Sequence, residues 1–175
     1  VDAEKKITTA FLQTPEGYRP NGSVSWNAYV QFCHLSSGKN GSLDKMEQLA
    51  KENTEVADVQ FYLGRAYEMV YKEYEKAGQA YMYAAEMTTS IEDKLDILGD
   101  AAKAYCRGGM KLKTEEIIER MRQDVFQYGA GEETLATTLR EVANIDSDMD
   151  FFYGLTDREG NKINKIDKTA ISCQI

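Results

Sequence analysis

Proline occurs only near the start of this 175-residue chain, at Pro15 and Pro20. A proline lacks a backbone N–H and its ring clashes with the preceding helical turn, so a stretch without proline permits long α-helices. Within residues 21–175, apolar side chains recur three and four positions apart, as at Val59, Tyr62 and Leu63. This spacing places them on one face of a helix. We therefore predict an all-α fold.

Short turns are expected to separate the helices. A first helix is predicted over residues 2–12, followed by a loop that contains both prolines. Further helices are predicted to begin near Ser25, Leu43, Glu55, Tyr74, Ser90, Thr114 and Glu132. The chain therefore divides into an N-terminal helix and loop (1–24), a helical repeat region (25–145) and a C-terminal extension (146–175).

Two local features of the helical region can be predicted in more detail. Ser90 is expected to cap the helix that follows it, with Asp93 in the reciprocal place of a capping box. The helix over residues 74–87 carries a narrow face of alanines, which would let a neighbouring helix approach closely. These alanines are Ala77, Ala80, Ala84 and Ala85.

The C-terminal extension has a different pattern. Residues 151–156 (Phe-Phe-Tyr-Gly-Leu-Thr) are aromatic and typical of a strand, and residues 157–160 (Asp-Arg-Glu-Gly) are typical of a tight turn. Residues 162–166 would form the returning strand of a small β-hairpin. An isolated hairpin is marginally stable in water, so it would have to pack against the helices or against chain outside this sequence.

The centre of the chain resembles the tetratricopeptide repeat. Residues 63–67 (Leu-Gly-Arg-Ala-Tyr), followed by Ala77, Tyr81 and Ala84, match the leucine-glycine pair, the tyrosine and the second-helix positions of that signature. A second pair, Leu98-Gly99, follows 98 − 63 = 35 positions later, close to the repeat period of about 34. A competing alignment, about three residues later and based on residues 104–108, stays open.

The sequence also departs from the tetratricopeptide pattern. Gln60, beside Phe61, replaces the first-helix tryptophan, and no repeat has the closing proline. The turn between Val70 and Tyr74 is one residue longer than usual. The resemblance extends over residues 26–127, and residues 77–86 and 101–105 are also similar to the soluble attachment proteins of membrane fusion, which stack the same kind of helix pair.

The resemblance implies antiparallel helix pairs stacked as a short right-handed superhelix, in which the first helices line a concave groove. The central repeat would contribute Phe61, Tyr62, Arg65, Glu68 and Met69, the preceding repeat Asn27, Gln31 and His34, and the next repeat Lys103 and Arg107. Such a mixed aromatic and charged groove suits an amphipathic helix or an extended peptide. Asn27 matches one position of the family's clamp for a terminal carboxylate, but Tyr62 and Asp96 do not supply the others, so that ligand is not expected.

Charge and composition restrict the partners. The chain has 29 acidic and 21 basic residues, a formal net charge of −8, which disfavours binding to the phosphates of nucleic acid. No apolar run of about 18 residues is present to enter a membrane. The three cysteines are widely spaced, which favours reduced thiols and a cytoplasmic location. The chain begins without methionine or an apolar signal core, so we expect it to be part of a larger protein.

No motif for a metal, a cofactor or catalysis is complete. His34 is the only histidine, and no second histidine or paired cysteine joins it and Cys33 in a metal set. Residues 38–42 (Gly-Lys-Asn-Gly-Ser) lack the spacing of a phosphate-binding loop. The aspartates at 146, 148 and 150 are spaced as in a calcium loop, but Phe151 occupies the place of the required glycine. We therefore expect neither a metal nor a cofactor.

These observations favour a non-enzymatic protein-interaction module or scaffold that binds another protein or peptide. A structural or oligomerisation domain is the first alternative, and it would leave Leu135, Leu139 and Val142 exposed until another copy covered them. An enzyme that uses carboxylates such as Glu68 or Glu86 in a pocket is the second alternative. The sequence does not determine the oligomeric state.

Overall fold

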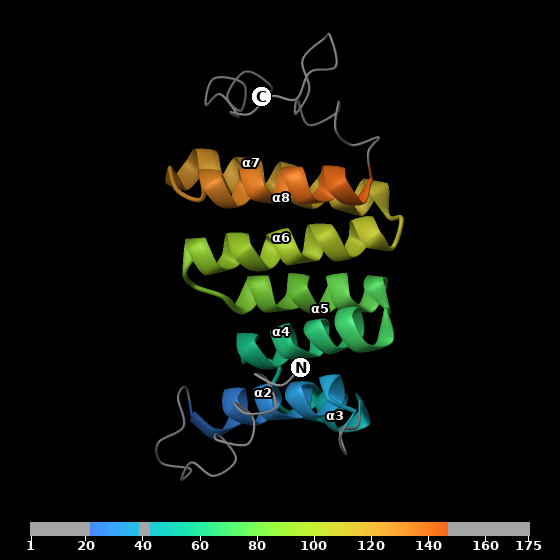
Figure 1. Ribbon diagram of the computed structural model, residues 1–175. Helices are drawn as coiled ribbons and strands as arrows, with labels where there is room; N and C mark the ends of the chain where they lie inside the picture. Colours follow the sequence, from blue (N-terminus) through green and yellow to red (C-terminus); the bar gives the residue numbers. More distant parts are fainter. Residues whose placement is uncertain (1–21, 39–42, 147–175) are drawn as a thin grey trace. The chain divides into compact units, whose positions relative to one another are not determined.

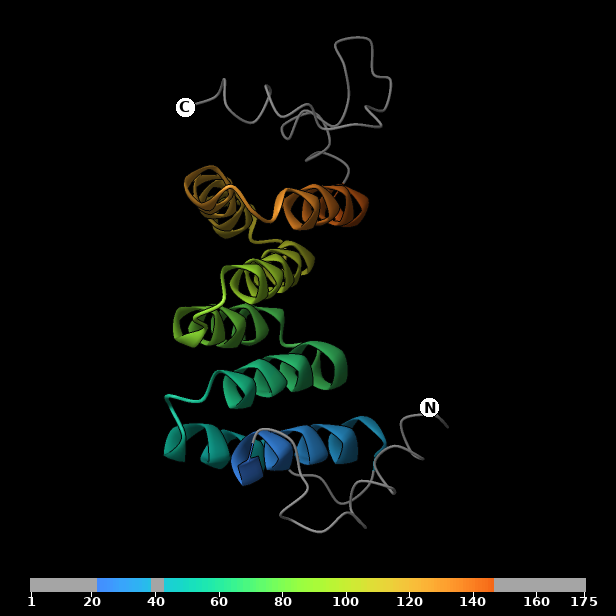
Figure 2. The same cartoon turned by 90° about the vertical axis from the view of Figure 1, so that its left-hand side faces the viewer.

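The computed structural model describes residues 22–38 and 43–146. In these ranges the regular structure is entirely helical, without a strand, which confirms the predicted all-α class. The helix predicted over residues 2–12 and the hairpin predicted within 146–175 lie outside the described residues. The described residues form two compact units, which divide between Met87 and Thr88. Figure 1 and, turned by 90°, Figure 2 show the helices of both units.

The first unit is built around one central helix. Its elements are α2 (Gly22–Ser36), α3 (Leu43–Glu52), α4 (Ala57–Ala66), η2 (Tyr67–Tyr71) and α5 (Tyr74–Met87). Helix α4 packs against α2, α3 and α5, and α4 and α5 run antiparallel in Figure 1. Of the apolar positions of α4 that the sequence placed inward, Val59, Leu63 and Ala66 are buried, whereas Tyr62 is only half-buried.

Helix α4 continues into a single π-helical turn, η2, before the chain reverses. The wider turn is closed by bonds from the backbone N–H groups of Lys72 and Glu73 to the carbonyl oxygen of Tyr67. Lys72 ends the turn in the left-handed region, with a φ of 58°. A π-turn contains one more residue than an α-turn, between the residues that its hydrogen bond joins. This geometry accounts for the extra residue noted between Val70 and Tyr74.

Small residues bring α4 and α5 close together. A Cβ atom added at Gly64 would lie 2.8 Å from ring atoms of Tyr81, so only glycine leaves room for that ring. On α5, the predicted alanine face is buried, at Ala77, Ala80, Ala84 and Ala85. The leucine-glycine pair of the first unit therefore packs against the next helix along the chain.

The second unit contains three longer helices, α6 (Ile91–Arg107), α7 (Lys111–Tyr128) and α8 (Glu132–Ile145). Helix α6 packs against both of the others. The Oγ atom of Ser90 accepts a bond from the backbone N–H of Asp93, which confirms the predicted cap. Helix α7 begins three residues before the predicted Thr114, and that threonine is buried instead of lying at the helix start.

The second leucine-glycine pair packs differently from the first. A Cβ atom at Gly99 would lie 2.6 Å from the Oγ1 atom of Thr138, which is on α8 and not on α7, the next helix. Gly64, by contrast, meets α5. The spacing of 35 residues between the two pairs therefore does not mark equivalent packing positions.

Candidate functional site

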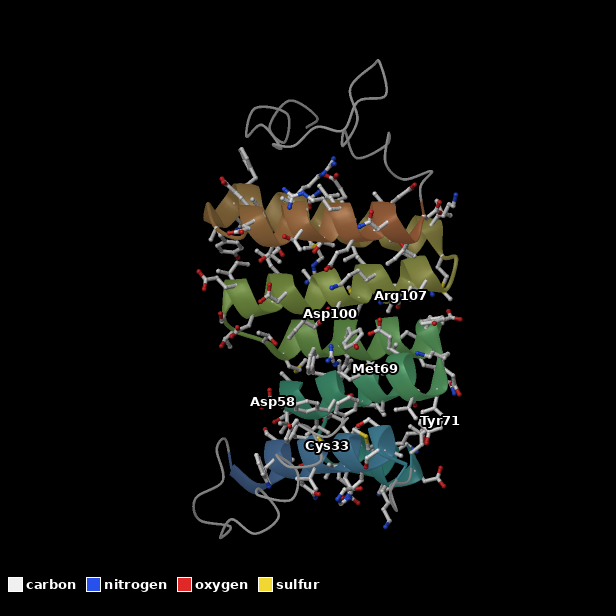
Figure 3. All side chains as sticks on the ribbon, viewed as in Figure 1. Cys33, Asp58, Met69, Tyr71, Asp100 and Arg107 are labelled. Carbon is white, nitrogen blue, oxygen red and sulfur yellow. The ribbon has the colours of Figure 1, made fainter. Side chains whose placement is uncertain are left out.

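Five of the predicted groove residues share one side of the continuous α4–η2 segment. Phe61, Tyr62, Arg65, Glu68 and Met69 recur at spacings that keep them within about a third of the helix circumference. Together they are called the α4–η2 face below. Its first four residues are half-buried and Met69 is 46% exposed. Figure 3 labels Met69 on this segment, between Asp58 at its start and Tyr71 at its end.

The aromatic residues of this face belong to a chain of ring contacts. The ring centroid of Tyr62 lies 5.4 Å from that of Tyr29, 6.0 Å from that of Phe32 and 5.4 Å from that of Phe61. Phe61 in turn lies 5.6 Å from Tyr81 on α5. Aromatic pairs at these distances are mutually stabilising. The chain of rings therefore links α2, α4 and α5 and holds the half-buried rings of Phe61 and Tyr62 in place.

Tyr62 also has an altered acidity. Burial raises the pKa of its phenol, and the negative charge of Asp58 one turn earlier raises it further. The phenol is therefore neutral at physiological pH and available as a hydrogen-bond donor and acceptor at the edge of the cluster.

The charged residues of the face each contact an aromatic side chain. The guanidinium carbon of Arg65 lies 5.8 Å from the ring centroid of Phe61, within the range of a cation–π contact. The carboxylate of Glu68 accepts a 2.7 Å hydrogen bond from the hydroxyl of Tyr81. A positive and a negative group are thus fixed one turn apart along the same face.

A second phenol–carboxylate pair lies beside the π-turn and was not predicted. The hydroxyl of Tyr67 donates a 2.5 Å hydrogen bond to the carboxylate of Glu47 on α3. Burial and this hydrogen bond together raise the pKa of Tyr67 well above its usual range. Nothing local in the sequence indicated Glu47, since it lies twenty residues before its partner. The pair fixes η2 against α3 at the end of the α4–η2 face.

The three residues predicted from the preceding repeat lie elsewhere on α2. Asn27 is exposed, and Gln31 and His34 are half-buried. Their spacing of four and three residues puts them on the side of α2 opposite Tyr29 and Phe32, the two residues that contact Tyr62. The structure therefore does not bring them onto the α4–η2 face. The side of α2 that adjoins Tyr62 carries Tyr29 and Phe32 in place of the predicted Asn27, Gln31 and His34.

The two predicted residues of the next repeat lie on α6, in the second unit. Arg107 is exposed in the last turn of α6 (Figure 3). The Nζ atom of Lys103 lies 2.8 Å from a carboxylate oxygen of Glu141 and 3.1 Å from one of Asp100. Burial lowers the pKa of Lys103, but the two carboxylates outweigh it and the net effect is a raised pKa.

The alternative functions depend on metal ligands, on carboxylates such as Glu86 and on exposed apolar side chains of α8. Among the described residues, no group of three or more histidines, cysteines or acids could hold a metal ion. Glu86 is exposed on α5. The side chains whose exposure would indicate an oligomerisation surface are buried: Leu135, Leu139 and Val142. Over the same ranges, no helix combines the length and hydrophobicity needed to cross a bilayer.

The described thiols are buried and unpaired. Cys33 lies in the core of α2, and Cys106 contacts the carbonyl oxygen of Val142 on α8 at 3.8 Å. Burial raises the pKa of the Cys106 thiol, which disfavours the reactive thiolate. These two cysteines therefore serve as small core residues.

No match to a protein-family model, a curated protein or a solved structure was found for this chain.

Proposed function

We propose that this chain is a protein-interaction module that binds an amphipathic helix or an extended peptide of a partner protein across the α4–η2 face. The observation that carries this proposal is a set of half-exposed aromatic rings, Phe61 and Tyr62, held from beneath by buried rings of α2 and α5. Aromatic side chains that are already ordered lose little conformational freedom on binding, so they make effective anchors.

The residues around these rings support the same proposal. Arg65 and Glu68 supply fixed charges of opposite sign, and Met69 supplies a flexible apolar side chain beside them. An amphipathic partner would place its apolar stripe on the rings and its polar flank on the charges. Methionine adapts its shape to different apolar partners, which suits a binding surface.

We further propose that the helix pairs belong to a short, right-handed, tetratricopeptide-like superhelix within a larger cytoplasmic protein. The antiparallel packing of α4 and α5, with Gly64 against the ring of Tyr81, supports the first part. The buried free thiols of Cys33 and Cys106 support a reducing compartment. In this arrangement the α4–η2 face would form part of the concave groove.

Site-specific photocrosslinking tests the proposed face. The photoreactive residue p-benzoylphenylalanine is introduced at Met69 and, as a control, at Tyr83 on α5, because these side chains are 46% and 45% exposed. We expect a discrete protein adduct from position 69 in lysate of the source cells, and a loss of most of it when Arg65→Ala is added. Arg140→Ala, an exposed arginine on α8, should leave the adduct unchanged. Equal adducts from positions 69 and 83, or none from 69, would contradict the proposal.

A further inference from the structure

Asp58 lies on the same side of the helix as the α4–η2 face, although it was not among the residues predicted to face a partner. It precedes Tyr62 by four residues and Arg65 by seven, and both spacings return to the same side of an α-helix. Figure 3 labels Asp58 on α4, where the residue is half-buried. A carboxylate therefore stands one turn before the aromatic rings of the face.

The carboxylate of Asp58 has no counter-ion in the part of the chain that the structure describes. It takes part there in no ion pair and in no side-chain hydrogen bond. The two charged residues of the face do have partners, because Arg65 lies against the ring of Phe61 and Glu68 accepts a hydrogen bond from Tyr81. Asp58 is therefore the charge on this side of the helix that is left for a partner.

Aromatic rings adjoin this carboxylate. Burial and the negative charge of Asp58 both raise the pKa of the Tyr62 phenol, so the carboxylate lies near that side chain. The ring of Tyr62 also contacts Tyr29 and Phe32. A cation held by a carboxylate beside such rings gains an ion pair and a cation–π contact together. The formal net charge of −8 over the chain also attracts cationic partners.

An arginine side chain suits this position better than a lysine or a metal ion does. The planar guanidinium can donate two parallel hydrogen bonds to a carboxylate and can stack on an aromatic ring, whereas the ammonium of lysine is a strongly hydrated point charge. A metal ion needs several ligand atoms around one point. Among the described residues, Asp58 belongs to no group that could hold one.

The spacing between Asp58 and Arg65 favours a helical partner over an extended one. Seven residues of a helix rise about 10.5 Å, and a seven-residue step on a partner helix also returns to one side. Along an extended chain, side chains on one side recur at about 7 and about 13 Å, and neither distance matches. A partner helix that lies along the face can therefore place one charge opposite each of these two residues.

We propose that the segment bound by the α4–η2 face is an amphipathic helix with an arginine and a glutamate seven residues apart. Its arginine pairs with Asp58 and stacks on Tyr62, its glutamate pairs with Arg65, and apolar side chains between them pack on Phe61. The inference rests on the function proposed above, because it specifies the partner of the same face.

The test titrates synthetic peptides into the isotope-labelled 175-residue chain and follows its amide signals by NMR. The reference peptide is an alanine–glutamine helix of about 18 residues. It carries an arginine and a glutamate seven residues apart, with two leucines between them on the same side. We expect amide shifts centred on residues 58–69. A citrulline version replaces the guanidinium by a neutral group of the same shape and should bind about tenfold more weakly.

A double-mutant cycle isolates the pairing with Asp58. Asp58→Asn should weaken binding of the arginine peptide about tenfold, and binding of the citrulline peptide less than about twofold. Asp44→Asn is the matched control, because Asp44 also lies in the first turn of its helix, α3, and is exposed. This control should change neither affinity by more than about twofold.

The outcomes separate this inference from the proposed function. Equal effects of Asp58→Asn on the two peptides, with shifts still centred on the α4–η2 face, would overturn the arginine pairing and leave the face itself intact. A version with two alanines replaced by proline cannot form the helix, so binding as tight as that of the reference peptide would contradict a helical partner. Absence of shifts on the face with every peptide would contradict the proposed function as well.

Discussion

At the scale of single residues, side chains far apart in sequence fix the described structure by specific contacts. Tyr67 and Tyr81 each direct a phenol hydroxyl to a carboxylate on another element, Glu47 and Glu68 respectively. Neither pair could be predicted from the sequence, because a hydrogen bond between residues 20 or 13 positions apart depends on the tertiary packing that brings them together. The tyrosines themselves were recognisable as packing residues with a polar tip.

The Tyr67–Glu47 pair predicts a pH dependence. An unfolded chain ionises tyrosine near pH 10, whereas the folded chain keeps Tyr67 protonated to higher pH. The stabilisation is therefore complete below about pH 10 and is lost as the pH rises towards the folded-state pKa. Denaturant unfolding of the wild type should show a free energy that falls above about pH 10 by up to about 1.4 kcal/mol per pH unit from this one group.

Tyr67→Phe should make that decline shallower and should cost about 1 kcal/mol at pH 7, where the hydrogen bond to Glu47 is lost. Tyr128→Phe, which removes a phenol that is 56% exposed, reports the general effect of the substitution. A Tyr67→Phe profile with the same alkaline slope as the wild type would show that this pair does not couple folding to pH.

At the scale of elements, backbone conformation decides where helices start and stop. Gly129 and Gly131 both have positive φ angles in the short connection between α7 and α8. A Cβ atom at Gly131 would lie 2.1 Å from the Cδ1 atom of Leu95 on α6, and only the lack of a side chain permits this approach. Gly109 has a similar φ of 74°, but a Cβ atom there would meet nothing within 4 Å.

Gly109 and Gly131 make a matched pair for mutagenesis, because both have a positive φ and only Gly131 has a close neighbour. Gly109→Ala should destabilise the protein by about 1 kcal/mol, the cost of a positive φ for alanine. Gly131→Ala should destabilise the protein by about 1 to 3 kcal/mol more than Gly109→Ala does, because the fully buried Leu95 must move. Chemical denaturation measures both values. Equal losses would mean that the contact with Leu95 contributes nothing beyond the backbone conformation.

The elements also show what the sequence could and could not predict. Proline-free apolar periodicity located most of the helices, the alanines of α5 indicated its buried face, and Ser90 marked the start of α6. The sequence could not reveal that the segment after Ala66 forms a π-turn, since that depends on which carbonyl the N–H of Glu73 reaches. The sequence placed Asn27, Gln31 and His34 beside the α4–η2 face, whereas the structure packs the other side of α2 there, with Tyr29 and Phe32 on Tyr62. Which side of a helix faces its neighbour depends on this tertiary packing.

At the scale of the whole molecule, the proposed interaction face lies within the first unit, which presents ordered aromatic rings with flanking charges. The second unit has an acidic hollow between α6 and α8. Lys103 illustrates the limit of the sequence argument here. It was predicted to face a partner, whereas in the structure Asp100 and Glu141 hold it within the second unit. The ion pair of Lys103 with Glu141 joins α6 to α8 across 38 residues, so local patterns could not predict it.

The dissociation constant of the crosslinked partner for Met69→Asp, compared with that for Tyr83→Asp, tests the proposed interaction face most directly. Both substitutions place a charge at an exposed apolar position, so neither should perturb the fold. Burying a carboxylate against the partner's apolar stripe should raise the constant at least about tenfold for Met69→Asp. Tyr83→Asp should leave it within about twofold of the wild-type value. Equal effects, or a larger effect of Tyr83→Asp, would contradict binding across the α4–η2 face.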